Sequence, residues 1–229
     1  MSFPRIQPIA EHALMVEFSA TEDDRAHEQV IDLDAALRAA PFPGCLEVVP
    51  ALVSLLVEFD PEETDHARAG VAISRLMAAG GQARKSPEVH QMGICYDEEF
   101  SPDLPEVAAR TGLSPAQVIA AHVAGEYSVA MYGFAPGYAY LSGLPAALRL
   151  PRKPFAIRDV PAGSVIIAAA QCLVTTLTMP TGWWIIGRSR NPILQMEAAH
   201  PFRFDIGDRI RFHQISRDEL GAAGAGSQP

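Results

Sequence analysis

The chain has 229 residues, of which 48% are hydrophobic and 20% charged, the composition of a soluble protein with a real core. Its formal net charge of −9 argues against a nucleic-acid partner held through phosphate contacts. Three widely separated cysteines, Cys45, Cys95 and Cys172, lack CxxC spacing, which excludes a disulfide framework and a zinc site and favours a reducing compartment.

Targeting and membrane signals are also missing from the sequence. Residues 1–5 lead into no uninterrupted apolar run of the kind a signal peptide needs. The most apolar segment, Val165 to Met179, contains Gln171 and three threonines and falls short of a membrane span. We therefore expect a soluble cytoplasmic protein with no membrane partner and no bound metal.

Residues 1–82 are predicted to form a small α/β domain. Apolar alternation predicts strands at 14–18 and 53–59, with a short strand at 45–49 between them. Thr21 with Asp24 resembles a capping box, and an apolar face follows it at spacings of 4, 3, 4 and 3. Its residues are Ala26, Val30, Leu33, Leu37 and Ala40.

A second helix is predicted to begin at Asp60-Pro61, which offers an N-cap carboxylate and a proline at the first helical position. Gly80-Gly81 stops it. We predict the order ββαββα for this domain, an open sheet covered by two helices. The polar run from Gly80 to Pro87 is predicted to be a linker.

Residues 88–216 are predicted to form a second, β-rich domain. After a strand at 89–95, Asp103 can cap a short helix, and Ser114 with Gln117 forms a capping box that opens another. Short strands with long Gly/Pro connections then point to a barrel or sandwich. These strands are predicted at 127–132, 164–169, 173–179, 183–188 and 209–213. Residues 217–229 are predicted to be a disordered tail, because the segment from Gly221 to Pro229 is small and polar.

The most informative stretch is the segment from Gly133 to Leu141, because glycine and proline punctuate it too densely for a helix or a central strand. Aromatic residues between them supply apolar anchors, so we expect an ordered loop that frames a binding surface. Its candidate site residues are Gly133, Phe134, Pro136, Gly137 and Tyr138.

Three further residues are candidates for chemistry, each with a structural alternative. Arg152 can bind a carboxylate or phosphate bidentately, or it can fix a loop through backbone carbonyls. His122 flanks the apolar side of a helix, where it can transfer protons, contact substrate or simply pack. Ser164 lies in a Pro-Ala-Gly-Ser turn and is expected to bond the local backbone rather than act as a nucleophile. The sequence identifies no catalytic residue.

At these motifs the chain resembles a known family. The matching segments are Gly133-Phe134-x-Pro136-Gly137-Tyr138-x-Tyr140-Leu141, Pro151-Arg152, Val160-Pro161-Ala162-Gly163-Ser164 and Gly182-Trp183-x-x-Ile186-Gly187-Arg188, with His122 and Gly207-Asp208 among the further matches. The chain is similar to the B subunit of 5-oxoprolinase, also called allophanate hydrolase subunit 1, a family that includes the histidine-kinase inhibitor KipI. The same module occurs in the carboxyltransferase region of urea carboxylase.

The resemblance implies an α+β fold: a small N-terminal α/β domain and a C-terminal cyclophilin-like β-barrel. It also implies two partners, a homologous C subunit and an A subunit, with which the chain would open 5-oxoproline, a small lactam, to glutamate. ATP and Mg would be used by that assembled hydrolase rather than bound by this chain. The site is expected in the cleft where the barrels of the B and C subunits face each other.

One motif departs from the family pattern. The family usually reads Gly-Gly-Gln-Thr-Gly-Ile/Val-Tyr-Pro where this chain has Ala169-Ala170-Gln171-Cys172-Leu173-Val174-Thr175-Thr176. Gln171 survives, and its amide can orient a substrate carbonyl or amide or bond neighbouring strands. Two functions therefore stay open: a hydrolase subunit that acts only with its partners, and a regulatory protein that inhibits a sensor histidine kinase.

Overall fold

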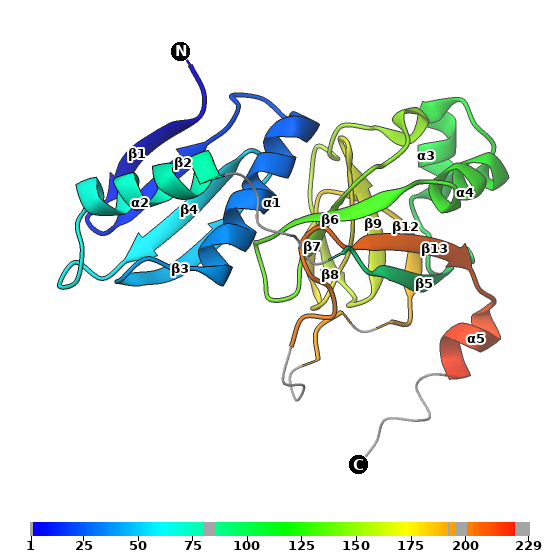
Figure 1. Cartoon of the computed structure of the whole chain (residues 1–229). Coiled ribbons are helices and arrows are strands. Elements are labelled where there is room, and N and C mark those ends of the chain that lie inside the picture. The colour runs from blue at the N-terminus through cyan, green and yellow to red at the C-terminus, as the bar shows by residue number, and fades with distance from the viewer. Residues whose placement is uncertain (1, 80–85, 192, 196–200, 223–229) are drawn as a thin grey trace. The chain divides into compact units, whose positions relative to one another are not determined.

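The structure is a computed structural model that describes residues 2–79, 86–191, 193–195 and 201–222. The chain divides into two compact units, Met1–Ser86 and Pro87–Pro229 (Figure 1). Most of the linker expected between Gly80 and Pro87 lies outside the described residues. Each unit has its own hydrophobic core.

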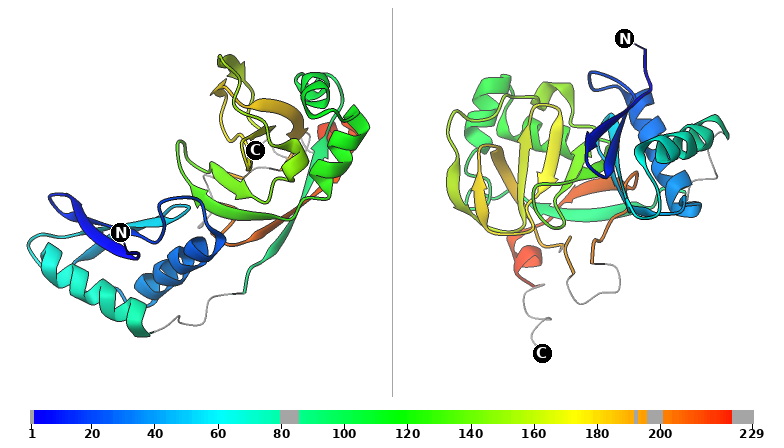
Figure 2. Two further views of the ribbon diagram at one scale, coloured as in Figure 1. Left: turned by 90° about the horizontal axis from the view of Figure 1, so that it is seen from above. Right: turned by 90° about the vertical axis from the view of Figure 1, so that its left-hand side faces the viewer.

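The first unit is an antiparallel sheet with the strand order β1-β2-β4-β3. Its elements are β1 (Arg5–Ala10), β2 (Ala13–Glu17), α1 (Asp24–Ala39), β3 (Cys45–Pro50), β4 (Ser54–Phe59) and α2 (His66–Ala79). Both helices lie on the same face of the sheet (Figure 2). Alternate residues of β4 are buried against them, as the apolar alternation predicted. The predicted ββαββα order is the order observed.

Both predicted helix starts in this unit are wrong by a few residues. The N-cap of α1 is Asp23, whose carboxylate accepts a hydrogen bond from the amide of Ala26 at 2.7 Å, rather than Thr21. The second helix does not begin at Asp60, because the Asp60 side chain and carbonyl accept bonds from the next residues and close a turn. Asp65 provides the real cap by accepting from Arg68.

The second unit is a closed barrel with the strand order β10-β7-β6-β13-β5-β12-β9, which confirms the predicted barrel. Its strands are β5 (Val89–Cys95), β6 (Tyr127–Tyr132), β7 (Ala139–Ser142), β9 (Ser164–Ala168), β10 (Gln171–Val174), β12 (Trp184–Ser189) and β13 (Arg209–Gln214). The pair β13 and β5 is parallel, and the other barrel pairs are antiparallel.

Helices and a small extra sheet surround the barrel. They are α3 (Leu104–Thr111), α4 (Pro115–Val123), the 3-10 turn η1 (Ala146–Leu148), the strand pair β8 (Ile157–Val160) and β11 (Met179–Thr181), and α5 (Arg217–Ala222). Helices α3 and α4 pack against each other beside the barrel (Figure 1). The capping box of Ser114 and Gln117 is formed as predicted, whereas the Asp103 side chain makes no cap bond.

Two predictions for this unit need correction. The strand predicted at 173–179 is two strands, since β10 ends at Val174 and β11 begins at Met179 in a different sheet. The predicted tail 217–229 begins with helix α5, because Ser216 and Glu219 form reciprocal hydrogen bonds between side chain and backbone. Residues 223–229 of that prediction lie outside the described residues.

Candidate functional site

The candidate site lies on the outer face of strands β7, β9 and β10. Cys172 pairs with Leu141, and both side chains belong to the barrel interior. Their neighbours Gln171 and Tyr140 therefore point outward together. Because Ile167 pairs with Trp184 in the same interior, Trp183 faces outward beside Ala168. We call Tyr140, Arg152, Gln171 and Trp183, grouped around Ala168, the outer aromatic site.

Ring contacts hold the outer aromatic site together. The Tyr140 and Trp183 rings meet edge to face with their centroids 6.0 Å apart. The guanidinium carbon of Arg152 lies 5.5 Å from the centroid of the Trp183 ring, on its face. Trp183 itself is 5% exposed, so the site has a rigid aromatic wall and a charged rim.

The loop from Gly133 to Tyr138 closes on itself. The amide of Gly133 donates to the carbonyl of Tyr138, and the amide of Tyr138 donates to the carbonyl of Ala135. Thr176 anchors the loop by donating its hydroxyl to the Pro136 carbonyl at 2.7 Å. Gly137 has a φ of +72°, a conformation that glycine adopts without strain. The loop is therefore compact and ordered, and the concave surface predicted for it stays a prediction.

Phe134 is the most unusual residue of this loop. Its φ is +70°, which costs an L-residue about 1–2 kcal/mol, yet its side chain is 76% exposed. Its ring touches only the edge of Tyr138 among the ring contacts of the described residues. A strained backbone that presents an exposed aromatic ring makes Phe134 a candidate contact residue.

His122 lies inside the barrel rather than at this surface. The side chain is fully buried and stacks on Phe212 with ring centroids 4.8 Å apart. Its Nδ1 is 2.7 Å from the Tyr96 hydroxyl, and its Nε2 is 3.5 Å from the Cys172 sulfur. The placement matches the packing alternative for His122 and separates it from the outer aromatic site.

The interior cluster is also electrically neutral. Burial lowers the pKa of His122 to about 3 and raises the pKa of the Cys172 thiol well above its usual value. An imidazole with so low a pKa is a weak base, and a thiol kept un-ionised by burial is a poor nucleophile at neutral pH. Ser164 is fully buried and donates its hydroxyl to the Pro161 carbonyl at 2.8 Å, as the sequence suggested.

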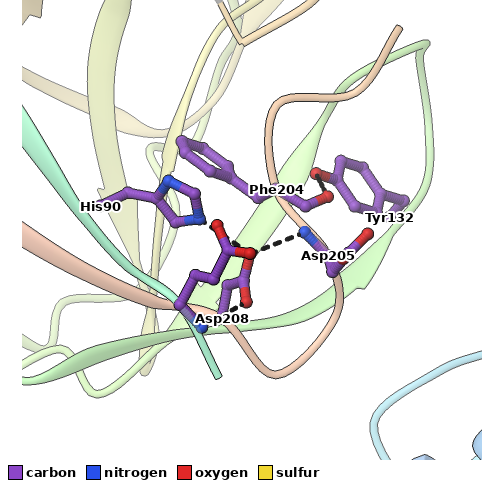
Figure 3. A network of polar contacts seen from close by, with 6 residues as sticks. His90, Tyr132, Phe204, Asp205 and Asp208 are labelled. Atoms are coloured by element: carbon purple, nitrogen blue, oxygen red, sulfur yellow. Dashed lines mark hydrogen bonds and ion pairs between the residues drawn. The ribbon is translucent and has the colours of Figure 1, made fainter. Parts of the chain in front are cut away.

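A second polar cluster ties the start of β5 to the turn before β13 (Figure 3). The Asp208 carboxylate accepts hydrogen bonds from the amides of Glu88 and Asp205, each at 2.9 Å, and from His90 Nε2 at 2.8 Å. Burial alone would raise the pKa of Asp208, but these bonds hold it below its usual value. Since its bonding capacity is used internally, we assign Asp208 a structural role.

The first unit carries a shallow apolar groove of about 680 Å³ between α2 and strands β1 and β2. Gly70, Ala67 and Ala78 line the helix side of it. A Cβ placed on Gly70 would meet nothing within 4 Å. The groove contains none of the residues that the sequence singled out.

The structure brings some predicted site residues together and separates others. Arg152 and Gln171 share the outer aromatic site, and Tyr138 packs in the same outer cluster as Trp183. His122 does not join them. Tyr140 was not predicted as a site residue, because the four residues of strand β7 are too few to show a clear period. The adjacent residues Trp183 and Trp184 lie in different clusters, on opposite sides of the barrel wall.

No helix in the described part of the chain has the length and hydropathy needed to cross a membrane.

A family model covers most of the sequence: residues 4–204 match the carboxyltransferase domain, subdomain C and D. The chain belongs to this carboxyltransferase family. Two similar curated proteins are each named as the B subunit of 5-oxoprolinase. The Bacillus subtilis protein is 32% identical over 95% of both chains. The Escherichia coli O157:H7 protein is 30% identical over 93% of this chain and 96% of its own.

Solved structures agree with this family assignment. The chain is 35% identical to TTHA0988, with a TM-score of 0.79 over 89% of this chain, but it spans only 40% of the TTHA0988 chain. It is 30% identical to PH0987 from Pyrococcus horikoshii, with a TM-score of 0.56 over 94% of this chain and all of that one. The Kluyveromyces lactis urea carboxylase, 13% identical, shares the fold over 95% of this chain and 22% of its own, with a TM-score of 0.73.

Proposed function

We propose that this chain is the B subunit of a heteromeric, ATP-dependent 5-oxoprolinase that opens 5-oxo-L-proline to L-glutamate. One observation carries the proposal: two relatives, each named as the B subunit of that enzyme, align over more than nine tenths of both chains. A match of this extent covers the outer aromatic site as well as the fold. A variant of this proposal is that the chain is the corresponding subunit of an enzyme that hydrolyses allophanate.

The geometry supports a subunit that binds the substrate but does not hydrolyse it without its partners. The outer aromatic site offers a cation, an amide and a phenol, whereas the buried histidine and thiol are neutral and enclosed. Hydrolysis of a lactam needs an activated nucleophile or an activated carbonyl. We therefore place the activating groups, together with ATP and Mg, on the C and A partner subunits.

A partner is also supported by the longer relative. In TTHA0988 the part similar to this chain makes up 40% of a single polypeptide, so there the unit is continuous with more protein. The exposed ring of Phe134 and its strained backbone suit a surface that is covered by another protein chain. This surface adjoins the outer aromatic site through Tyr138.

The test is reconstitution. This chain is co-expressed with the A and C subunits from the same genome, purified, and assayed for ADP and glutamate release from 5-oxo-L-proline. We expect turnover only when all three proteins are present, and none from this chain alone. Full activity without this chain would contradict the proposal, as would release of ammonia from allophanate with no glutamate formed. Inhibition of a sensor kinase by the isolated chain, without enzyme activity in any mixture, would support the regulatory alternative.

A further inference from the structure

Two pairs of consecutive residues, Arg152-Lys153 and Trp183-Trp184, pack against each other at the outer aromatic site. Arg152 lies over the ring of Trp183, and the next residue, Lys153, lies over the ring of Trp184 with its Nζ 5.6 Å from the centroid. The backbones are joined as well, since the Lys153 amide donates to the Gly182 carbonyl at 2.7 Å. The Trp184 indole donates to the Pro151 carbonyl at 2.8 Å. Four contacts thus fix the segment that carries Arg152.

This packing is anchored by a buried ion pair. The Lys153 ammonium is 2.5 Å from a carboxylate oxygen of Asp103, and that oxygen also accepts the amide of Ile185 at 2.7 Å. The side chain of Lys153 is 5% exposed. The charge of Lys153 is therefore used in a buried ion pair that stabilises the fold, whereas its neighbour Arg152 is exposed on the surface.

Three polar side chains, Arg152, Tyr140 and Gln171, lie around Ala168 on the outer face of the barrel. Within the described residues, the Arg152 guanidinium, the Tyr140 hydroxyl and the Gln171 amide make no side-chain hydrogen bond or ion pair. Burial raises the pKa of Tyr140, and the charge of Arg152 opposes that rise, so the two groups act on each other. Gln171 and Tyr140 stand diagonally on neighbouring strands, within reach of one ligand.

We propose that Arg152 and Tyr140 bind the carboxylate of a small organic acid, and that Gln171 pairs with an amide of the same molecule. The guanidinium fork fits a carboxylate bidentately, and the phenol, uncharged at neutral pH, donates a third hydrogen bond. The Gln171 side chain offers one donor group and one acceptor, the complement of a lactam.

The carboxylate assignment follows from Arg152 and Tyr140 alone. The choice of 5-oxo-L-proline as the acid rests on the proposed function, since that molecule carries both a carboxylate and a lactam. The two statements are therefore separable by experiment.

The test measures binding by the full chain, alone and in the reconstituted complex. The side-chain resonance of the Trp183 indole and tryptophan fluorescence are followed while 5-oxo-L-proline is added. Acetate, 2-pyrrolidinone and inorganic phosphate are titrated in parallel. We expect 5-oxo-L-proline to shift Trp183 in one or both preparations, and 2-pyrrolidinone, which lacks the carboxylate, to bind about tenfold more weakly or not at all.

Three variants sharpen the result. Arg152→Gln should weaken binding of 5-oxo-L-proline about tenfold or more, and Tyr140→Phe should weaken it about threefold to tenfold. Arg158→Gln is the matched control, because Arg158 is an exposed arginine on β8 outside the site. It should bind as the wild type does. Unchanged thermal melts of the variants show that the fold is kept.

The outcomes decide both statements. Equal binding by the wild type and Arg152→Gln would overturn the site, as would equal binding of 2-pyrrolidinone, tighter binding of phosphate, or no binding of any probe in either preparation. Arg152-dependent binding of acetate without binding of 5-oxo-L-proline would keep the carboxylate site and contradict the proposed function. Arg152-dependent binding of 5-oxo-L-proline supports both.

Discussion

The two units of this protein differ in how many of their described residues have a left-handed backbone conformation. In the first unit, regular strands and two helices bury alternate residues, and Gly44 is its single described residue with a left-handed φ. In the barrel unit, five glycines and three non-glycine residues have a left-handed φ: Gly112, Gly137, Gly143, Gly163, Gly207, Phe134, Asp159 and Ala169. Unusual backbone is thus concentrated in the unit that carries the candidate site.

The contrast teaches where specific geometry is needed. A sheet covered by helices needs only apolar residues at the right period. The outer aromatic site instead needs loops that return tightly to the barrel, and such loops require conformations that most residues avoid. The barrel unit should therefore be intolerant of changes at its turns, and the first unit should accept changes more readily.

The largest expected effect is at Gly143. Its φ is +93°, and a Cβ there would lie 2.0 Å from the carbonyl oxygen of Glu126. We expect Gly143→Ala to lower the free energy of unfolding of the barrel by about 4 kcal/mol or more. Urea unfolding followed by tryptophan fluorescence measures this, because both tryptophans, Trp183 and Trp184, lie in the barrel unit.

The matched control is Gly112→Ala. Gly112 also has a left-handed φ, +71°, but its Cβ would meet nothing within 4 Å. Its expected loss is about 1 kcal/mol, the backbone cost alone. If the two variants lost the same stability, the steric part of the explanation would be wrong.

An intermediate effect is expected from His122 at acid pH. Its pKa falls from 6.5 to about 3 in the folded chain, so below pH 6.5 the unfolded chain binds a proton that the folded chain does not. Stability is full above pH 6.5 and falls by about 1.4 kcal/mol for each pH unit down to about pH 3. Between pH 7 and pH 5 the wild-type barrel should lose about 2 kcal/mol more than His122→Gln does.

Unfolding curves at pH 7, 6 and 5 measure this difference. The Asp208 carboxyl does not interfere, because its pKa is lowered from an ordinary value of 3.8 and its contribution is lost only below that range. Parallel losses in the wild type and in His122→Gln would show that another group governs the acid response.

The smallest expected effect is a gain in the first unit. Gly70 lies inside helix α2, and a Cβ there would meet nothing within 4 Å. Gly70→Ala should stabilise this unit by about 0.5–1 kcal/mol, because glycine in a helix interior loses more backbone freedom on folding than alanine does. Amide hydrogen exchange in α2 of the full chain would show slower exchange. Faster exchange would mean that the glycine serves the packing.

The sequence was a good guide wherever periodicity decides the structure. It predicted β6 at its observed bounds and the capping box at Ser114. It failed at Asp60, where a local turn outcompetes a helix start, and at Tyr140, which sits in a four-residue strand. The pairing of Arg152 with Trp183 depends on tertiary contacts between distant segments, which no local pattern encodes.

The parallel pairing of β13 with β5 has a consequence for how the chain is made. Arg209 pairs with Val89, 120 positions earlier in the chain (209 − 89). A growing chain therefore completes every segment of the first unit long before its barrel can close. Until Arg209–Gln214 has left the ribosome, β5 and β6 stay unpaired along the edges that β13 later fills, and open edges of this kind invite aggregation. We expect nascent barrels halted before that strand to be the species that chaperones hold.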